Sequence, residues 1–223
     1  MATWIAHLRI AENLSKKYDF EEEAFVVGNI GPDSGVPNED WSRFDPPKEV
    51  THWIETENGI VKSEEFYKKY LDKPDIKSDK NRYSFLLGYY FHLLSDIEWD
   101  KMDKAKRKIN NALDQRLKED PKFIWEVKKD WYGLDFLYLQ ENKKSIFFNR
   151  FMKIDKVEDY LDYFPNGAFT RQVKYITSFY LENIAKEDDN RKFIYLTKEE
   201  MNSFVNKTTD IISGIIREKN LFH

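Results

Sequence analysis

Hydrophobic side chains recur at intervals of three and four residues along most of this chain, which is the spacing of an amphipathic helix. Thr3 is placed to cap a first helix, whose apolar face runs from Trp4 to Leu14. The same periodicity predicts further helices over residues 21–30, 63–71, 82–117, 121–142, 156–163, 168–186 and 197–217. Residues 145–154 are expected to be extended or to form a loop.

The segment from Tyr83 to Trp99, YSFLLGYYFHLLSDIEW, is apolar on nearly all sides. Such a pattern is typical of a helix buried in the middle of a bundle. Strand signals are weak and isolated, and neither repeats nor a linker interrupt the 223 residues, a length that suits one domain. We therefore predict an all-α fold in which residues 1–223 form a single-domain, multi-helix bundle.

A long irregular segment, residues 31–62, separates the second predicted helix from the third. Its glycines and prolines are Gly31, Pro32, Gly35, Pro37, Pro46, Pro47 and Gly59. Loops of this length inside a compact domain often carry function. The residues expected to form part of the rim of a site are Asn38, Glu39, Asp40, Trp41, Arg43 and Phe44.

Charge and cysteine content narrow the functional classes. The chain has 36 basic and 40 acidic residues, a net charge of −4, which does not suit a dedicated nucleic-acid binder. It has no cysteine, so disulfides, thiolate metal ligands and thiol catalysis are excluded. The N-terminal sequence lacks the features of a signal peptide, and no apolar run is long enough for a transmembrane segment. A cytoplasmic location is therefore expected.

One of the four histidines and an aspartate lie together on the predicted buried central helix. His92 and Asp96 are four residues apart, so their side chains lie on one helical face and can reach one ion. A buried carboxylate is costly unless it is paired or binds a metal. The pair is therefore either part of a metal site or a hydrogen bond between helices. His223, the last residue, is uninformative.

Three more residues complete a candidate metal site, although each has an ordinary explanation alone. His52 can be a simple loop residue, Asp33 a turn residue and His7 a core histidine. Together with the helical pair they supply three imidazoles and two carboxylates, a mixture that suits zinc, with manganese and iron as alternatives. We predict that one or two ions are held by His7, Asp33, His52, His92 and Asp96.

Four stretches within about the first 100 residues carry a family resemblance: TWIAHLRIAE, GNIGPDSG, VTHW and GYYFHLLSDIEW. In these stretches the chain resembles the zinc-dependent phospholipases C, in particular a bacterial branch without secretion signals, and the related zinc-dependent single-strand nucleases. The resemblance implies their all-helical fold. It also implies that Asp33, His52, His92 and Asp96 surround one zinc ion, and that Asp96 bridges to a second ion bound by His7.

The chain also departs from that family. The secreted enzymes place the amine and carbonyl of a processed N-terminal tryptophan on a metal, whereas Trp4 is internal here, so the second ion is expected to lack this ligand. A third zinc needs two further histidines, and none occurs between residues 93 and 222. We expect the third site to be absent. The less favoured alternative builds it from carboxylates such as Glu98, Asp100, Asp130 or Asp135.

The favoured hypothesis is a metal-dependent hydrolase that attacks a small phosphate ester or diester with metal-activated water. Asp33 would be both a ligand and a general base, and Arg43 or Arg82 would meet the phosphate. The alternative is a non-enzymatic helical protein with a structural or relic metal site that acts as a binding or scaffold module. Phosphohydrolases that use adjacent His and Asp residues are disfavoured, because the sequence has no His-Asp dipeptide.

Aromatic residues leave two structural questions open. Trp41, Trp53 and Trp99 either line the cleft or belong to the core, and the core is favoured. The aromatic residues of the second half either cover the core or form a dimer contact; they are Phe147, Phe148, Phe151, Tyr160, Tyr163 and Phe164.

Overall fold

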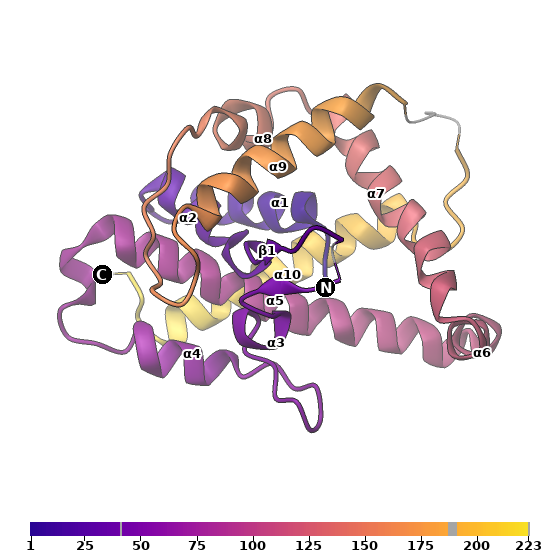
Figure 1. The fold of residues 1–223 in the computed structure, drawn as a ribbon, viewed down its shortest axis with the longest axis horizontal. Helices are drawn as coiled ribbons and strands as arrows, with labels where there is room; N and C mark the ends of the chain where they lie inside the picture. The colour runs from indigo at the N-terminus through magenta and orange to yellow at the C-terminus, as the bar shows by residue number, and fades with distance from the viewer. Residues whose placement is uncertain (41, 187–190, 223) are drawn as a thin grey trace.

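The structure is a computed structural model that describes residues 1–40, 42–186 and 191–222. Helices dominate it, as the all-α prediction requires (Figure 1). The α-helices are α1 (Trp4–Ser15), α2 (Glu22–Gly28), α3 (Lys48–Thr51), α4 (Ser63–Tyr70), α5 (Lys80–Ile109), α6 (Asn111–Glu119), α7 (Ile124–Glu141), α8 (Ile146–Asn149), α9 (Ala168–Asn183) and α10 (Lys198–Glu218). Two short antiparallel strands, β1 (Val36–Pro37) and β2 (Phe44–Asp45), form a hairpin.

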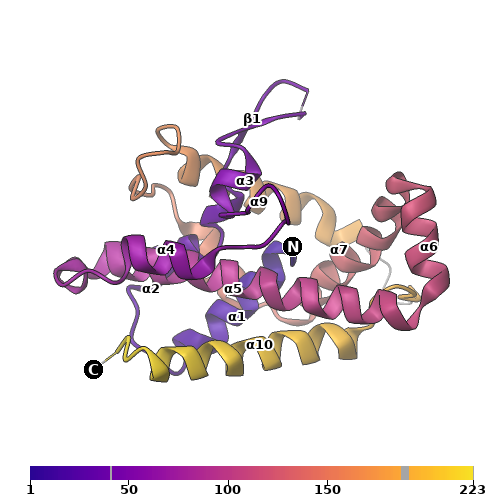
Figure 2. The same ribbon diagram turned by 90° about the horizontal axis from the view of Figure 1, so that it is seen from below.

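Helix α5 is the centre of the fold. Every residue from Tyr83 to Asp96 is buried, which matches the continuous apolar pattern of this segment. Helix α10 runs alongside α5 and α1, and α4 packs on the N-terminal half of α5 (Figure 2). Helix α10 begins with a capping box, in which Thr197 and Glu200 bond reciprocally to each other's backbone amides. The hairpin and α3 project from the side of α5 opposite α10.

Helices α2 and α5 make the closest contact of the described bundle, and two glycines permit it. A Cβ atom on Gly28 would lie 2.1 Å from the carbonyl oxygen of Phe85, and one on Gly88 would lie 2.3 Å from that of Phe25. Both distances are far inside van der Waals contact, so the two backbones touch directly. This approach brings the end of α2, with Asn29, against the face of α5 that carries the candidate site.

Two helix predictions need correction. The segment 82–117 is two helices, because the side chain of Asn110 accepts a hydrogen bond from the amide of Leu113 and so caps α6. Residues 156–163 are not helical. The amide of Val157 is satisfied from outside the segment, because it donates to the Thr170 hydroxyl at 3.0 Å, which favours an irregular path.

The segment 145–154, expected to be extended or a loop, instead forms α8 and a turn of 3-10 helix, η4 (Phe151–Lys153). The aromatic side chains of the second half belong to the core or pack against it, including Phe147, Phe151 and Phe164. None of the helices formed by the described residues combines the length and the apolar character that crossing a membrane requires.

Candidate metal centre

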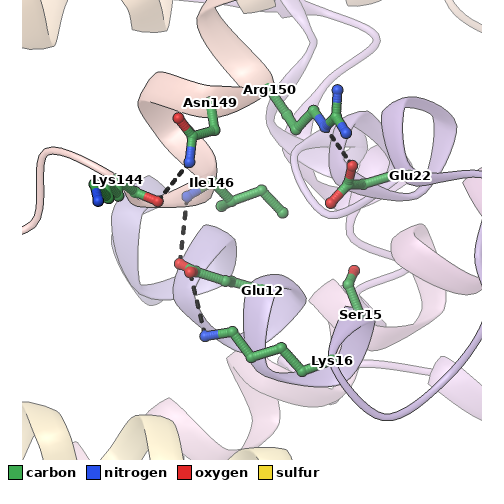
Figure 3. Close-up of a pocket in the computed structure, with 8 residues that line it drawn as sticks. All are labelled: Glu12, Ser15, Lys16, Glu22, Lys144, Ile146, Asn149 and Arg150. Carbon is green, nitrogen blue, oxygen red and sulfur yellow. Dashed lines mark hydrogen bonds and ion pairs between the residues drawn. The ribbon is translucent and has the colours of Figure 1, made fainter.

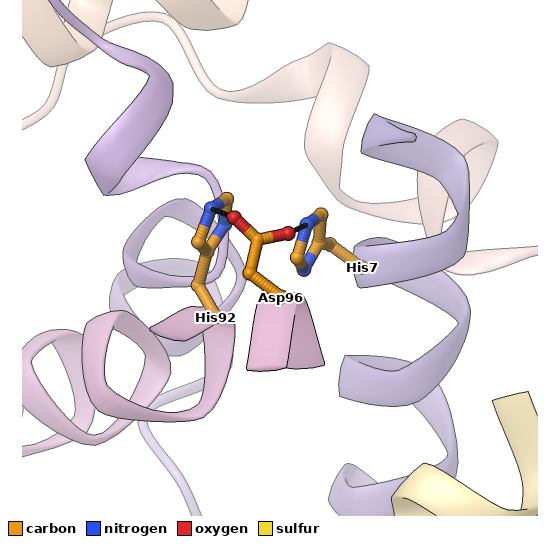
Figure 4. Close-up of side chains that lie close together, drawn as sticks. All are labelled: His7, His92 and Asp96. Atoms are coloured by element: carbon orange, nitrogen blue, oxygen red, sulfur yellow. Dashed lines mark ion pairs between the residues drawn. The ribbon is translucent and has the colours of Figure 1, made fainter. Parts of the chain in front are cut away.

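The five residues predicted as metal ligands lie together beside α5. His7 comes from α1, Asp33 from the 3-10 helix η1 (Gly31–Asp33), His52 from the residue after α3, and His92 and Asp96 from α5. Figure 4 shows the Asp96 carboxylate between the imidazoles of His7 and His92. One oxygen, Oδ1, is 3.4 Å from Nε2 of His7, and the other, Oδ2, is 3.4 Å from Nε2 of His92.

The remaining two ligand candidates approach from the long irregular segment. Nε2 of His52 is 3.2 Å from Oδ1 of Asp33 and 3.8 Å from Oδ2 of Asp96. The structure therefore contains two overlapping trios, His7–His92–Asp96 and Asp33–His52–His92, each with ligand atoms within 4.8 Å of one another. Segments up to 90 residues apart in the sequence thus meet at one point.

Backbone groups hold His92 and Asp96 in place, and the ring of His7 stacks on that of His92. Nδ1 of His92 is 2.8 Å from the carbonyl oxygen of Asn29 and donates its proton there, which leaves Nε2 as a free lone pair facing the cluster. The ring of His7 stacks on that of His92 with a centroid distance of 3.8 Å. Oδ1 of Asp96 also accepts a hydrogen bond from the amide of Ala2 at 2.9 Å.

His52 is oriented by its own helical turn. The Thr51 hydroxyl donates to the carbonyl oxygen of Lys48, so it accepts from Nδ1 of His52 at 2.9 Å, and Nε2 again faces the cluster without a proton. The Tyr89 hydroxyl from α5 donates to the carbonyl oxygen of Thr51, and Tyr163 donates to Tyr89 at 3.1 Å. These bonds attach the α3 segment to the central helix.

Asp33 is held by both of its oxygens. Oδ1 faces His52, and Oδ2 accepts a hydrogen bond from the indole Nε1 of Trp4 at 2.9 Å. The Trp4 ring contacts Tyr175 and Phe179 edge-on, so α1 and α9 together fix the position of this carboxylate. The spacing of Trp4 in the sequence predicts its place on a helix face but does not indicate a bond to Asp33.

Several nitrogen and oxygen atoms of the cluster are buried without a hydrogen-bond partner. They are Nδ1 and Nε2 of His7, Nε2 of His52, Nε2 of His92 and Oδ2 of Asp96. The exposed fractions are 0% for His7 and His92, 3% for His52 and 5% for Asp96. Leaving a buried polar atom unsatisfied costs about 1–3 kcal/mol. Cations bound to the three Nε2 atoms and to Oδ2 of Asp96 would relieve most of this concentration of unsatisfied atoms.

The charges of the cluster suit a cation. Burial, helped by the charge of His92, lowers the pKa of His7 to about 4, so His7 is neutral at pH 7. Burial opposes ionisation of Asp33, but its close contact with His52 and the charge of His92 outweigh this and lower its pKa to about 2. Burial also opposes ionisation of Asp96, yet the neighbouring histidines hold its pKa well below the usual value. Two carboxylates are thus ionised in the interior.

The pKa of His92 shifts in the opposite direction from that of His7. Burial lowers the pKa of His92, but the charge of Asp96 and the close contact between the two side chains outweigh burial, and the net shift is upward. A divalent ion would compete with a proton at His92, because an imidazole must be neutral to bind a metal.

The acidic residues considered for a third metal ion all have partners elsewhere. Asp130 accepts hydrogen bonds from Arg191 and from the amides of residues 194 and 195, and Asp135 accepts from Thr3 and Tyr180. Glu98 and Asp100 pair with lysines of the same helix at 2.6 Å. Among the described residues these acids therefore form no third cluster.

A small cavity of about 110 Å³ leads from the surface to Asp33 and His52. Its lining comes from the irregular segment and the chain start, namely Met1, Pro32, Asp33, Gly35, Phe44, Pro46, Lys48, Thr51 and His52. Among the described residues of the predicted rim, Phe44 alone is part of this lining. Arg43 and Arg82 are not part of it, and Arg82 lines a different cavity beside Asp79.

The tryptophans assigned either to the cleft or to the core can now be placed. Trp99 is buried in the core against Trp131 and Phe204, and Trp53 packs on Phe66. Trp41 and His223 lie outside the described residues.

Comparisons with known proteins found no match: no family model, no curated protein and no solved structure is significantly similar to the chain. The motif resemblance to the zinc-dependent phospholipases C therefore stays a prediction. The described residues are mostly helical, which confirms the predicted all-α fold independently of that resemblance.

Proposed function

We propose that this protein binds one or two divalent metal ions and hydrolyses a small phosphate ester or diester. The observation that carries the metal site is the set of buried, unsatisfied nitrogen and oxygen atoms that converge beside α5. Imidazole and carboxylate ligands of this kind suit Zn²⁺, and the same ligands accept Mn²⁺ or iron. All three histidines of the cluster are oriented or buried so that an unpartnered ring nitrogen faces it.

The two oxygens of Asp96 suggest how two ions would share the cluster. Oδ2 lies on the side of His52, His92 and Asp33, which would hold a first ion. Oδ1 lies on the side of His7, which would hold a second. Second-sphere contacts support the first position, since Asn29 and Thr51 orient two of its imidazoles.

A divalent ion in such a site polarises a phosphoryl oxygen and lowers the pKa of a bound water. The protein's own residues then have separate tasks. His52 and Asp33 face the cavity through which a substrate would enter. Asp33 was predicted to be both ligand and general base; its pKa of about 2 makes it a weak proton acceptor at neutral pH, which supports the ligand role more than the base role.

A second candidate is a purely structural metal site in a helical scaffold protein. The burial of His92 and Asp96 favours it, since structural zinc is commonly enclosed by four protein ligands. The cavity that ends on Asp33 and His52 favours the catalytic reading, because a closed structural site needs no access from the surface.

Metal content tests the site directly. The protein, purified without chelators, would be analysed by inductively coupled plasma mass spectrometry beside His92→Ala and Asp96→Ala, with Asp210→Ala on the exposed face of α10 as control. We expect one or two equivalents of metal in the wild type and in the control, and loss in both cluster variants. Wild-type protein that carries no metal, and takes up none on addition of Zn²⁺, would refute the proposal.

Activity separates the catalytic from the structural reading. The metal-loaded protein would be assayed with p-nitrophenyl phosphate and bis(p-nitrophenyl) phosphate. Metal-dependent release of nitrophenol that is lost in His52→Ala supports the hydrolase. A fully loaded protein that is inactive on a broad panel of mono- and diesters, and that loses thermal stability when the metal is removed, would support the structural site instead.

A further inference from the structure

His52 is brought to the candidate metal centre by a segment with little structure of its own. It follows α3, a helix of only four residues in which Lys48, Glu49 and Val50 are exposed. A single helical turn is not stable alone, because the cost of nucleating it exceeds the gain from its few hydrogen bonds. The position of the His52 ring must therefore be set by contacts from outside α3.

The central helix supplies the first of these contacts. Tyr89 lies three residues before His92 and seven before Asp96, so the three side chains leave the same face of α5. The Tyr89 hydroxyl donates a hydrogen bond to the carbonyl oxygen of Thr51. One rigid helix thus carries two candidate ligands and the anchor of a third.

The anchored oxygen is directly connected to His52. The carbonyl of Thr51 and the backbone nitrogen of His52 belong to one planar peptide group, so a bond to this oxygen fixes the start of the His52 backbone. The Thr51 hydroxyl, in turn, accepts a hydrogen bond from Nδ1 of His52 at 2.9 Å. The position of Thr51 therefore determines that of both the backbone and the ring of His52.

A second tyrosine completes the anchor. The proton of the Tyr89 hydroxyl is used by Thr51, so its oxygen can accept, and the Tyr163 hydroxyl donates to it at 3.1 Å. Tyr163 belongs to the irregular segment before α9. The ring of Tyr89 is also fixed, because it stacks on that of Phe66 at a centroid distance of 4.7 Å. Since the Tyr89 side chain is fully buried, water does not compete for its hydrogen bonds.

The chain turns sharply on the other side of His52. Trp53 has a φ angle of 54°, in the left-handed region, which a tryptophan adopts only where its surroundings enforce it. Its ring packs edge-on against Phe66 and Tyr70, with centroid distances of 5.5 Å and 6.0 Å. His52 is therefore held between two fixed neighbours, Thr51 and Trp53.

Other segments of the protein are joined by contacts that are open to solvent. At a cavity of about 440 Å³, lined in part by α1, α2 and α8, Lys16 pairs with Glu12 at 3.2 Å and Arg150 with Glu22 at 2.5 Å (Figure 3). Lys16 and Arg150 are exposed, and water and salt weaken exposed ion pairs. The buried Tyr89 hydroxyl is not subject to this competition, which suits it to fix the position of a ligand.

We propose that Tyr89 and Tyr163 are positioning residues of the metal centre. Their hydroxyl groups hold Thr51 in place, so that Nε2 of His52 is already directed at the ion before the ion binds. The inference rests on the proposed metal-dependent function and adds two residues that do not touch the ion. Without the anchor, α3 would have to become ordered when the ion binds, and this cost would appear as weaker metal affinity.

Substitutions by phenylalanine test this role, because they keep the ring and remove only the hydroxyl. The Zn²⁺ affinity of the full chain would be measured by chelator competition for wild type, Tyr89→Phe and Tyr163→Phe. We expect Tyr89→Phe to weaken Zn²⁺ binding about 10- to 100-fold, as loss of a contact that orients a ligand does, and Tyr163→Phe to weaken it less. The double variant should bind Zn²⁺ as Tyr89→Phe does, since Tyr163 acts through Tyr89.

Tyr90→Phe is the matched control. Tyr90 is the next residue of α5, is equally buried, and donates its hydroxyl to Glu64 of α4 rather than to the α3 segment. Urea unfolding would report the stability of each variant, and the absorption of bound Co²⁺, which depends on the number and geometry of the ligands, would report the centre itself. We expect Tyr89→Phe to change the Co²⁺ spectrum toward that of His52→Ala, and Tyr90→Phe to keep the wild-type spectrum.

The outcomes separate this inference from the metal proposal. If wild type binds Zn²⁺ and Tyr89→Phe binds it no more weakly than Tyr90→Phe, the positioning role is wrong and the metal site stands. A double variant that binds far more weakly than Tyr89→Phe would show that Tyr163 acts independently, and would reject the connected chain of contacts. Wild-type protein that binds no Zn²⁺ would overturn both proposals.

Discussion

Asp135 lies in the interior where α1, α7 and α9 meet, and its substitution by asparagine gives a quantitative test of the structure. Its side chain is only 2% exposed and accepts hydrogen bonds from Thr3 at 2.7 Å and from Tyr180 at 2.6 Å. Burial raises the pKa of this carboxyl from 3.8 to about 7, despite those two hydrogen bonds and the charge of Arg9, which lower it.

The magnitude and the sign follow from that shift. A carboxyl that binds its proton more tightly in the folded protein contributes stability below its unfolded pKa, and this contribution is lost as the pH rises through the folded pKa. The shift of about 3 pH units in Asp135 corresponds to about 4 kcal/mol in total, at about 1.4 kcal/mol per unit. Between pH 5 and pH 8, about 3 kcal/mol of this should be lost.

Asparagine resembles the protonated carboxyl at every pH, because its amide offers both a donor and an acceptor to the two hydroxyl groups. Urea unfolding at pH 5 and pH 8 would be followed by circular dichroism for the wild type, Asp135→Asn and the exposed control Asp155→Asn. Between pH 5 and pH 8, we expect the free energy of unfolding of Asp135→Asn to fall by about 3 kcal/mol less than that of the wild type. At pH 8 the variant should therefore be the more stable protein. If Asp135→Asn and wild type lose the same stability between the two pH values, the assigned environment of this carboxyl is wrong.

Four further substitutions test separate features. In a denaturant titration, Gly88→Ala should destabilise the protein by about 2 kcal/mol or more, because its Cβ would lie 2.3 Å from a carbonyl oxygen of α2. Gly214→Ala should instead stabilise α10 by about 0.5–1 kcal/mol in the same titration, because no described atom lies within 4 Å of its Cβ. Trp4→Phe removes the hydrogen bond to Asp33 and should weaken metal affinity about 10- to 100-fold in a chelator competition, and unchanged affinity would exclude that supporting role. Thr197→Ala deletes the capping box and should cost about 1 kcal/mol in thermal unfolding, which a wild-type melting temperature would contradict.

Much of the helical framework could be predicted because its signals are local. Thr3 and Thr197 cap their helices as Thr does generally, and the unbroken apolar pattern around His92 identified the buried central helix. The prediction of a helix over residues 156–163 is wrong because of a tertiary contact. The amide of Val157 bonds to Thr170, thirteen residues away, and a local pattern carries no trace of that partner.

The candidate site, too, could be predicted only in part from the sequence. Helical spacing alone placed His92 and Asp96 on one face. The convergence of His7, Asp33 and His52 on that face was inferred from their chemistry and a motif resemblance, since their separation in the chain fixes no distance. The contact of Trp4 with Asp33 depends on helix packing and could not be predicted.

The direct backbone contact of α2 with α5 has a consequence for how this protein could diversify. Helices that touch through glycines at positions 28 and 88 have no side-chain layer that could adjust, so the spacing between Asn29 and His92 is fixed. The β1–β2 hairpin, by contrast, projects away from the bundle, and its residues 38–40 and 42–44 are exposed. We therefore expect related chains to keep the helical half of the centre constant and to differ in length and composition in this hairpin.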